Sequence, residues 1–123
     1  MDPKKMKISI ITVSYNSEKT IERTIQSVIN QDYTDYEYII IDGKSTDRTI
    51  EICNKYSDKI SKIISEKDSG IYDAMNKGIS LASGDIISIL NSDDYFANDR
   101  ILQIVSENLS TEIDLLLGNV EIF

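Results

Sequence analysis

Short runs of β-branched residues alternate with segments of helical periodicity along this chain, and that alternation restricts the folds it can adopt. Strand-length runs of β-branched and other apolar residues lie at 7–15, 36–41, 60–65, 85–90 and 113–117. The intervening segments carry apolar residues three or four positions apart, as helices do, at 18–30, 47–57, 71–82 and 99–109. This order predicts an α/β fold with a doubly wound, mostly parallel open sheet and helices on both faces.

Local signals add detail to these elements. Ser17 comes just before the first helical segment, where its hydroxyl is placed to cap the exposed amides of the first turn. A further short strand is expected at 119–123. The third helix should bury the face formed by Ile71, Met75, Ile79 and Ala82.

Composition and charge narrow the class of partner. The chain has 123 residues, which suits one domain, and its 41% hydrophobic content is ordinary for a chain that folds. A formal net charge of −8 argues against nucleic acid, which needs clustered Lys and Arg, and favours a cation. No apolar run approaches the roughly 18 residues of a membrane span, and the first residues lack a secretory signal, so a cytoplasmic location is expected.

The residue types present exclude several kinds of chemistry. The chain contains no histidine and one cysteine, Cys53, which rules out Ser-His and Cys-His catalysis, an internal disulfide and a thiolate zinc cage. Its glycines form neither the dinucleotide-binding fingerprint nor a phosphate-binding P-loop. Any reaction must therefore use carboxylates, hydroxyls, amides, amines or a metal held by oxygen.

Polar side chains follow each of the first four predicted strands. In an open parallel sheet, ligands bind outside the carboxyl ends of the strands, near the place where the strand order reverses. Singly, such residues most often form turns or cap helices. Together they favour a binding site at one edge of the sheet, built from Ser14, Tyr15, Asn16, Asp42, Glu66, Asp68, Asn91, Asp93 and Asp94.

The adjacent carboxylates of Asp93 and Asp94 are the sharpest chemical feature. Neighbouring carboxylates repel each other, and a divalent cation between them and a second anion relieves that cost. Mg²⁺ or Mn²⁺ fits this reading, because both prefer oxygen ligands and accept substrate phosphates as the rest of their shell. The spacing alone equally allows Asp94 to begin a turn into the next helix.

A second polar cluster lies on the third helical segment. Asp73 shares a helix face with Asn76 and Lys77, and an exposed ion pair explains that spacing as well as a site does. Tyr15 and Tyr72 could stack on a base, although packing is the commoner role of tyrosine.

Five motifs in this order resemble those of the family 2 glycosyltransferases, which have the GT-A fold. They read Thr-Val-Ser-Tyr-Asn at 12–16, Asp-Gly-Lys-Ser-Thr-Asp at 42–47, and Glu-Lys-Asp-Ser-Gly-Ile-Tyr-Asp-Ala-Met-Asn-Lys-Gly at 66–78. Ala-Ser-Gly-Asp follows at 82–85 and Leu-Asn-Ser-Asp-Asp at 90–94. Each motif is weak alone, but the ordered set is specific and extends over essentially the whole chain.

The resemblance implies a nucleotide-diphosphate-sugar donor bound along this edge of the sheet. Val13 and Tyr15 would touch the nucleoside, Asp42 would lie by the base, and Asp68 would lie near the nucleoside or the sugar. The metal motif would be Asp93 and Asp94, holding Mg²⁺ or Mn²⁺ on the diphosphate. The full set of implied donor-binding residues is Val13, Tyr15, Asp42, Asp68, Asp73, Asn76, Asn91 and Asp93.

Two positions depart from the family pattern. The family motif often begins with an acid where this chain has Asn91, which can coordinate a metal or accept a hydrogen bond but adds no charge. The family also often carries a second acid where this chain has Gly43, which leaves Asp42 as the acid expected near the base.

Family members usually continue well past this length, so the chain is expected to be the N-terminal, donor-binding part of a longer enzyme. The general base is then expected beyond Phe123, and the reaction implied is metal-dependent, inverting sugar transfer to a glycan or lipid-linked acceptor in bacterial polysaccharide synthesis. The full-length protein could associate with the inner face of the membrane.

Two other classes of function remain to be compared. A non-catalytic nucleotide-sugar-binding module is the alternative, with a homodimer through the exposed sheet edge as a partner hypothesis. A signalling receiver domain fits poorly, because the first strand ends in Ser14, Tyr15 and Asn16 rather than in a pair of acids.

Overall fold

A single five-stranded sheet organises the molecule, and all four strand pairings in it are parallel. The computed structural model describes residues 6–108 and 114–117, and the strand order is β3-β2-β1-β4-β5. The strands are β1 (Ile8–Ser14), β2 (Tyr36–Asp42), β3 (Lys62–Ser65), β4 (Ile86–Ile89) and β5 (Asp114–Leu117). The helices are α1 (Ile21–Ile29), α2 (Thr49–Asn54), the 3-10 turn η1 (Ser57–Lys59), α3 (Ile71–Leu81) and α4 (Ile101–Asn108).

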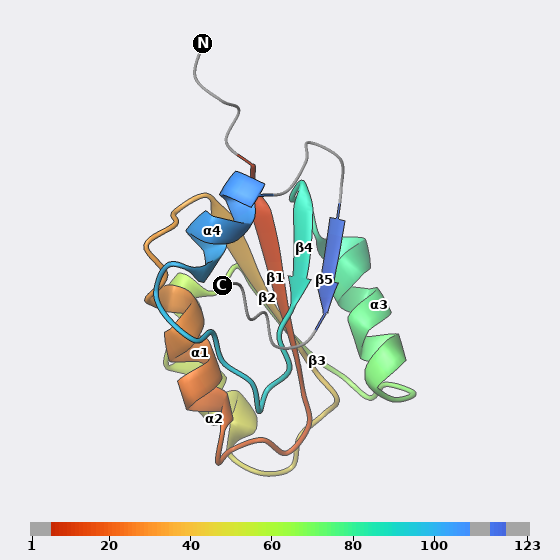
Figure 1. Cartoon of the computed structure of the whole chain (residues 1–123). Coiled ribbons are helices and arrows are strands. Elements are labelled where there is room, and N and C mark those ends of the chain that lie inside the picture. Colours follow the sequence, from red (N-terminus) through yellow and green to blue (C-terminus); the bar gives the residue numbers. More distant parts are fainter. Residues whose placement is uncertain (1–5, 109–113, 118–123) are drawn as a thin grey trace.

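Helices cover both faces of the sheet, as Figure 1 shows. Alternate residues of each strand point to opposite faces, so every central strand supplies two cores. On one face Ile8 and Ile10 pack with α1, α2 and α4, and on the other Ile11 and Val13 pack with α3. Because both faces are covered, β1 is buried along its whole length.

The α3 helix approaches β1 closely because its inner side is made of small residues. Ala74 and Gly78 are the buried residues of α3. A Cβ atom on residue 78 would lie 2.4 Å from Cγ2 of Ile11, so only glycine allows this approach. The contact fixes the second half of α3 against the middle of β1.

The sheet and its two helical layers confirm the predicted architecture. Two local predictions were wrong. The hydroxyl of Ser17 does not cap α1, which begins at Ile21 after a turn in which the carbonyl of Ser17 accepts the amides of Thr20 and Ile21. Ile71 is exposed rather than inward-facing, because Ala74 and Gly78 form the contact surface of α3.

Other predicted elements shift by a few residues. The second helical segment is shorter than 47–57, since α2 ends at Asn54 and a 3-10 turn follows. The strand expected at 119–123 lies outside the described residues. Within the part of the chain that the structure describes, no helix is both long and apolar enough to cross a membrane.

The strand order reverses between β1 and β4. From β1 the chain moves outward to β2 and β3, then returns to the other side of β1 to form β4 and β5. The loops that leave β1 and β4 therefore diverge and open a crevice at their carboxyl ends. This is the position at which the sequence predicts a site.

Candidate functional site

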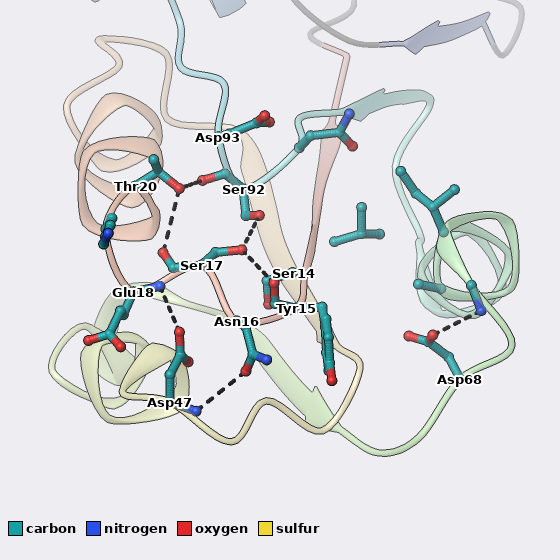
Figure 2. A pocket seen from close by; sticks show the side chains of 16 residues that line it. Ser14, Tyr15, Asn16, Ser17, Glu18, Thr20, Asp47, Asp68, Ser92 and Asp93 are labelled. Carbon is teal, nitrogen blue, oxygen red and sulfur yellow. Dashed lines mark hydrogen bonds between the residues drawn. The ribbon is translucent and has the colours of Figure 1, made fainter.

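A cavity of about 900 Å³ opens at the carboxyl ends of β1 and β4. Figure 2 shows its walls. Residues 13–20 line it from the end of β1 to the start of α1, and residues 91–93 line it from the loop after β4. The remaining wall comes from Asp47, Asp68, Gly70, Ile71 and Ala74. The cavity thus coincides with the point of strand reversal.

The loop after β4 is held by the buried residue Ser92. Its amide donates to the carbonyl of Val13 at 3.2 Å, and its hydroxyl is 2.6 Å from that of Ser17. Its carbonyl accepts the hydroxyls of Thr20 at 2.8 Å and Thr24 at 3.0 Å. Four bonds to β1, to α1 and to the turn between them therefore fix this loop at the cavity.

The residues on either side of Ser92 supply oxygen atoms with different environments. Asn91 lines the cavity, and its Oδ1 atom is buried with no hydrogen-bond partner in the described structure. Asp93 also lines the cavity and is exposed, whereas Asp94 is half-buried and outside the lining. A buried amide oxygen without a donor is costly, so Asn91 is suited to receive a cation or a ligand N–H or O–H.

The oxygen atoms of this loop suit a hard divalent cation that takes some of its ligands from the protein and the rest from a bound substrate. Amide and carboxylate oxygens are the ligands Mg²⁺ and Mn²⁺ prefer. Across residues 6–108 and 114–117 no group of three His, Cys, Asp or Glu side chains could cage a metal by itself. Asn91, Asp93 and Asp94 therefore suit an ion that takes its other ligands from a bound diphosphate and water.

The loop after β1 is tied to the loop after β2 by Asn16. This residue adopts a left-handed conformation, with φ of 47°, which asparagine tolerates better than most residues. Its side-chain oxygen accepts a hydrogen bond from the backbone amide of Thr46 at 2.8 Å. Its backbone amide donates to the hydroxyl of Ser45, also at 2.8 Å. The two loops consequently form one wall of the cavity.

Asp47 extends this wall toward α1. Its carboxylate accepts the amide of Thr49 at 2.9 Å, the Thr49 hydroxyl at 2.6 Å and the amide of Glu18 at 3.2 Å. Desolvation raises the pKa of Asp47, but these hydrogen bonds outweigh it and hold the pKa below its ordinary value. Asp47 thus stays ionised and keeps the start of α2 against the cavity.

Asp42 lies at the end of β2 but not in the cavity lining. It is fully buried, and its two carboxylate oxygens accept four hydrogen bonds. The donors are the hydroxyls of Ser14, Ser45 and Ser65 and the amide of Ser45, at 2.6–2.9 Å. The expected contact between Asp42 and the base stays a prediction, and within this fold the carboxylate joins three strand ends.

Asp68 does reach the cavity, whereas the neighbouring polar cluster does not. Asp73 accepts the amide of Ser69 at 2.8 Å and lies 3.7 Å from the ammonium of Lys77. Asn76 is exposed, and neither Asp73 nor Asn76 is among the lining residues. Their contact with a donor stays a prediction, and the observed ion pair matches the alternative of a solvated helix face.

Of the two tyrosines considered for stacking, Tyr15 lines the cavity and Tyr72 does not. Tyr15 is 62% exposed, so its ring is free to pack on a ligand. Val13 lies beside it in the cavity wall and is itself buried.

Sequence reasoning missed the hydroxyl network of Ser17, Thr20, Thr24 and Ser92. Thr24 is fully buried on the same side of α1 as Ile21, Ile25 and Val28. A polar residue inside an apolar helical stripe was the available signal, because buried hydroxyls need partners.

The glycosyl transferase family 2 model matches residues 9–123 of the chain. The chain belongs to this family. It is 35% identical over 116 residues to UDP-Glc:alpha-D-GlcNAc-diphosphoundecaprenol beta-1,3-glucosyltransferase WfgD of Escherichia coli. That alignment covers 94% of this chain and 46% of WfgD, so the chain spans less than half the length of that relative.

Solved structures agree with the GT-A architecture. The crystal structure of Staphylococcus aureus TarS 1-349 in complex with UDP-GlcNAc superposes with a TM-score of 0.77 and 31% identity, over 83% of this chain and 30% of that one. Mannosyltransferase PcManGT of Pyrobaculum calidifontis, in complex with GDP-Man and Mn²⁺, superposes with a TM-score of 0.72. At 22% identity, over 78% of this chain and 30% of that one, the second likeness shows the fold alone.

Proposed function

We propose that this chain is the donor-binding domain of a longer bacterial glycosyltransferase and that it binds a nucleotide-diphosphate-sugar in the cavity between β1 and β4. The observation that carries the proposal is the loop 91–93, which lines the cavity at the point of strand reversal with Asp93 and with Asn91, whose buried amide oxygen has no hydrogen-bond partner in the described structure. Donor complexes of TarS and the donor named for WfgD support the same class of ligand.

Each wall of the cavity has a role in holding the donor. Tyr15 stacks on the nucleoside and Val13 forms the apolar surface beside it. Asn91 and Asp93, with Asp94, hold Mg²⁺ or Mn²⁺ against the diphosphate. When bound, the cation supplies Lewis-acid stabilisation of the departing diphosphate.

Transfer also needs an acceptor and a general base. We place both outside these 123 residues, and we assign the reaction to an inverting transfer onto the hydroxyl of a glycan or lipid-linked acceptor. A lipid-linked acceptor would bring the full protein to the inner face of the membrane. The name of WfgD, which includes diphosphoundecaprenol, supports this class of acceptor.

Calorimetry tests the donor site. The chain should bind UDP or GDP in the presence of Mn²⁺, and Asp94→Ala and Asp93→Asn should each weaken that binding at least tenfold, because the metal loses a charged ligand. Asp58→Asn is the matched control, since Asp58 is exposed and lies in η1 outside the cavity lining. Nucleotide binding that is indifferent to Mn²⁺ and to both variants contradicts the assignment.

A donor-hydrolysis assay separates the enzyme from a binding module. Metal-dependent binding with slow release of sugar from the donor supports a transferase domain. Metal-dependent binding with no turnover favours the alternative, a nucleotide-sugar-binding module without catalysis of its own.

A further inference from the structure

Arg23 and Tyr95 form a cation–π contact beside the cavity. Arg23 lies in the first turn of α1, and Tyr95 directly follows Asp94 in the loop after β4. The guanidinium carbon of Arg23 lies 4.2 Å from the centroid of the Tyr95 ring, within the range in which an aromatic face attracts a cation. Both side chains are exposed. A surface arginine therefore lies over the residue next to the two candidate metal-binding aspartates.

Neither side chain has another polar partner in the part of the chain that the structure describes. Arg23 forms no ion pair there, in contrast to Arg48, which pairs with Glu51 at 2.8 Å. The hydroxyl of Tyr95 makes no hydrogen bond with any described residue. The contact between guanidinium and ring is therefore what orders these two exposed side chains.

The α1 helix holds the loop after β4 through two consecutive residues. Arg23 and Thr24 point in directions about 100° apart, as neighbours on a helix do. Thr24 is buried, and its hydroxyl donates to the carbonyl of Asp94 at 2.5 Å. Arg23 is exposed and contacts the next residue of the loop, Tyr95. Figure 1 shows this loop passing along α1 on its way to α4.

The acidic segment of the loop lies between two buried residues. Ser92 precedes it and is hydrogen bonded to β1 and α1. Phe96 follows it, is buried in the core, and donates its amide to a hydroxyl of α1 at 3.1 Å. The directions of the Asp93 and Asp94 carboxylates depend on rotation about the backbone bonds in between. Holding the Tyr95 ring restricts that rotation next to Asp94.

The contact lies outside the cavity itself. Neither Arg23 nor Tyr95 is among the lining residues, so neither side chain is placed to touch a bound nucleotide. Any effect of Arg23 on ligand binding must pass through the loop, which lines the cavity with Asn91, Ser92 and Asp93. Arg23 can therefore act as a positioning residue and not as a catalytic one.

We propose that Arg23 positions the loop after β4 for metal binding, because its cation–π contact with Tyr95 holds Asp93 and Asp94 in the orientation that binds the divalent cation. The inference rests on the proposed function, since it assumes that this loop holds the cation on a nucleotide diphosphate. It adds a residue outside the cavity and the contact through which that residue acts.

Calorimetry of nucleotide binding with and without Mn²⁺ tests the proposal on the 123-residue chain. The probe is UDP or GDP, whichever the unmodified chain binds more tightly in Mn²⁺. The quantity compared is the factor by which Mn²⁺ increases affinity, called here the Mn²⁺ factor. In Arg23→Gln it should fall about two- to fivefold, the equivalent of one exposed cation–π contact, while affinity without metal stays the same. A role in stability alone would leave the Mn²⁺ factor unchanged.

Variants of Tyr95 separate the contact from the charge of Arg23. Tyr95→Leu removes the ring but keeps the guanidinium, and it should lower the Mn²⁺ factor as much as Arg23→Gln does. Combining the two substitutions should cause no further loss, because both remove the same contact. Tyr95→Phe keeps the ring and Arg23→Lys keeps a cation, so each should retain most of the Mn²⁺ factor.

Arg48→Gln is the matched control for the loss of a positive charge. Arg48 is exposed and pairs with Glu51, and neither residue lines the cavity. The Mn²⁺ factor should therefore stay unchanged in this variant. A fall equal to that in Arg23→Gln would make net charge the cause and overturn the proposal.

The other outcomes separate this inference from the proposed function. An unchanged Mn²⁺ factor in Arg23→Gln or in Tyr95→Leu would overturn the role of Arg23 and leave a metal-dependent nucleotide site intact. Losses that add in the double variant would do the same, because Arg23 would then act independently of the ring. An unmodified chain that binds neither nucleotide, or binds them indifferently to Mn²⁺, overturns the proposed function and this inference together.

Discussion

At the scale of single residues, Asp42 shows how this fold organises the edge of its sheet. A buried carboxylate is costly unless hydrogen bonds replace its lost hydration. Here Ser14, Ser45 and Ser65 replace it, and each belongs to a different strand end or loop. Asp42 therefore holds together the loops that form the cavity wall, although it does not line the cavity itself.

Asp42→Ala should lower the free energy of unfolding by about 3 kcal/mol, because four hydrogen-bond donors lose the same buried, charged acceptor. Urea denaturation measures the change. Asp58→Ala, an exposed aspartate, should stay within about 0.5 kcal/mol of the unmodified chain. Equal stability of the two variants would refute this role of Asp42.

At the scale of elements, α1 holds the loop after β4. The hydroxyl of Thr24 donates to two carbonyls of that loop, at 3.0 Å to Ser92 and 2.5 Å to Asp94. The loop has no regular secondary structure of its own, so its geometry depends on such contacts. Any metal bound by residues 91–94 is thereby positioned by a helix that need not touch it.

Thr24→Val keeps the side-chain shape and removes both hydrogen bonds. It should cost about 1–2 kcal/mol of stability and weaken Mn²⁺-dependent nucleotide binding several-fold, with a smaller effect on binding without metal. Denaturation and calorimetry measure the two effects. Thr34→Val is the control, because Thr34 is exposed and far in sequence from this loop. A loss of stability with unchanged metal dependence would mean that Thr24 only supports the fold.

At the scale of the whole molecule, the sequence predicts the sheet more completely than the site. The buried strands and the amphipathic helices follow from local periodicity, which a sequence displays directly. The positions of Asp42 and Asp68 do not, because both follow strands and both are acids. Only the packing of the loops shows that the first is enclosed by serines and the second faces Gly43.

The first residue of α1 was also hard to predict, because it depends on contacts between residues far apart in the sequence. Ser17 has the chemistry of a helix cap, but its hydroxyl bonds to Ser92, which lies far away in the sequence. Tertiary contacts of this kind override local preference and cannot be read from spacing.

The core also predicts how stability depends on pH. Burial raises the pKa of the Cys53 thiol to about 12, and burial also raises the pKa of Tyr38. Above pH about 9 the unfolded chain releases these protons while the folded chain retains them, so stability falls as the pH rises. Between pH 7 and pH 10.5 Cys53 alone should account for about 2 kcal/mol.

Urea denaturation at the two pH values checks this prediction. Cys53→Ala should be less stable than the unmodified chain at pH 7, because it leaves a cavity, but it should lose about 2 kcal/mol less on going to pH 10.5. Identical losses in both proteins would show that the thiol titrates normally in the folded state.

The most direct test of the account is the position of Mn²⁺ in a crystal grown with UDP and Mn²⁺, located from its anomalous scattering. We expect the ion between the diphosphate and residues 91–94, with the Asn91 amide oxygen or the Asp93 or Asp94 carboxylate within ~2.0–2.6 Å of it. A nucleotide bound elsewhere, or a metal with no ligand from this loop, would contradict the assignment of the cavity between β1 and β4 as the donor site.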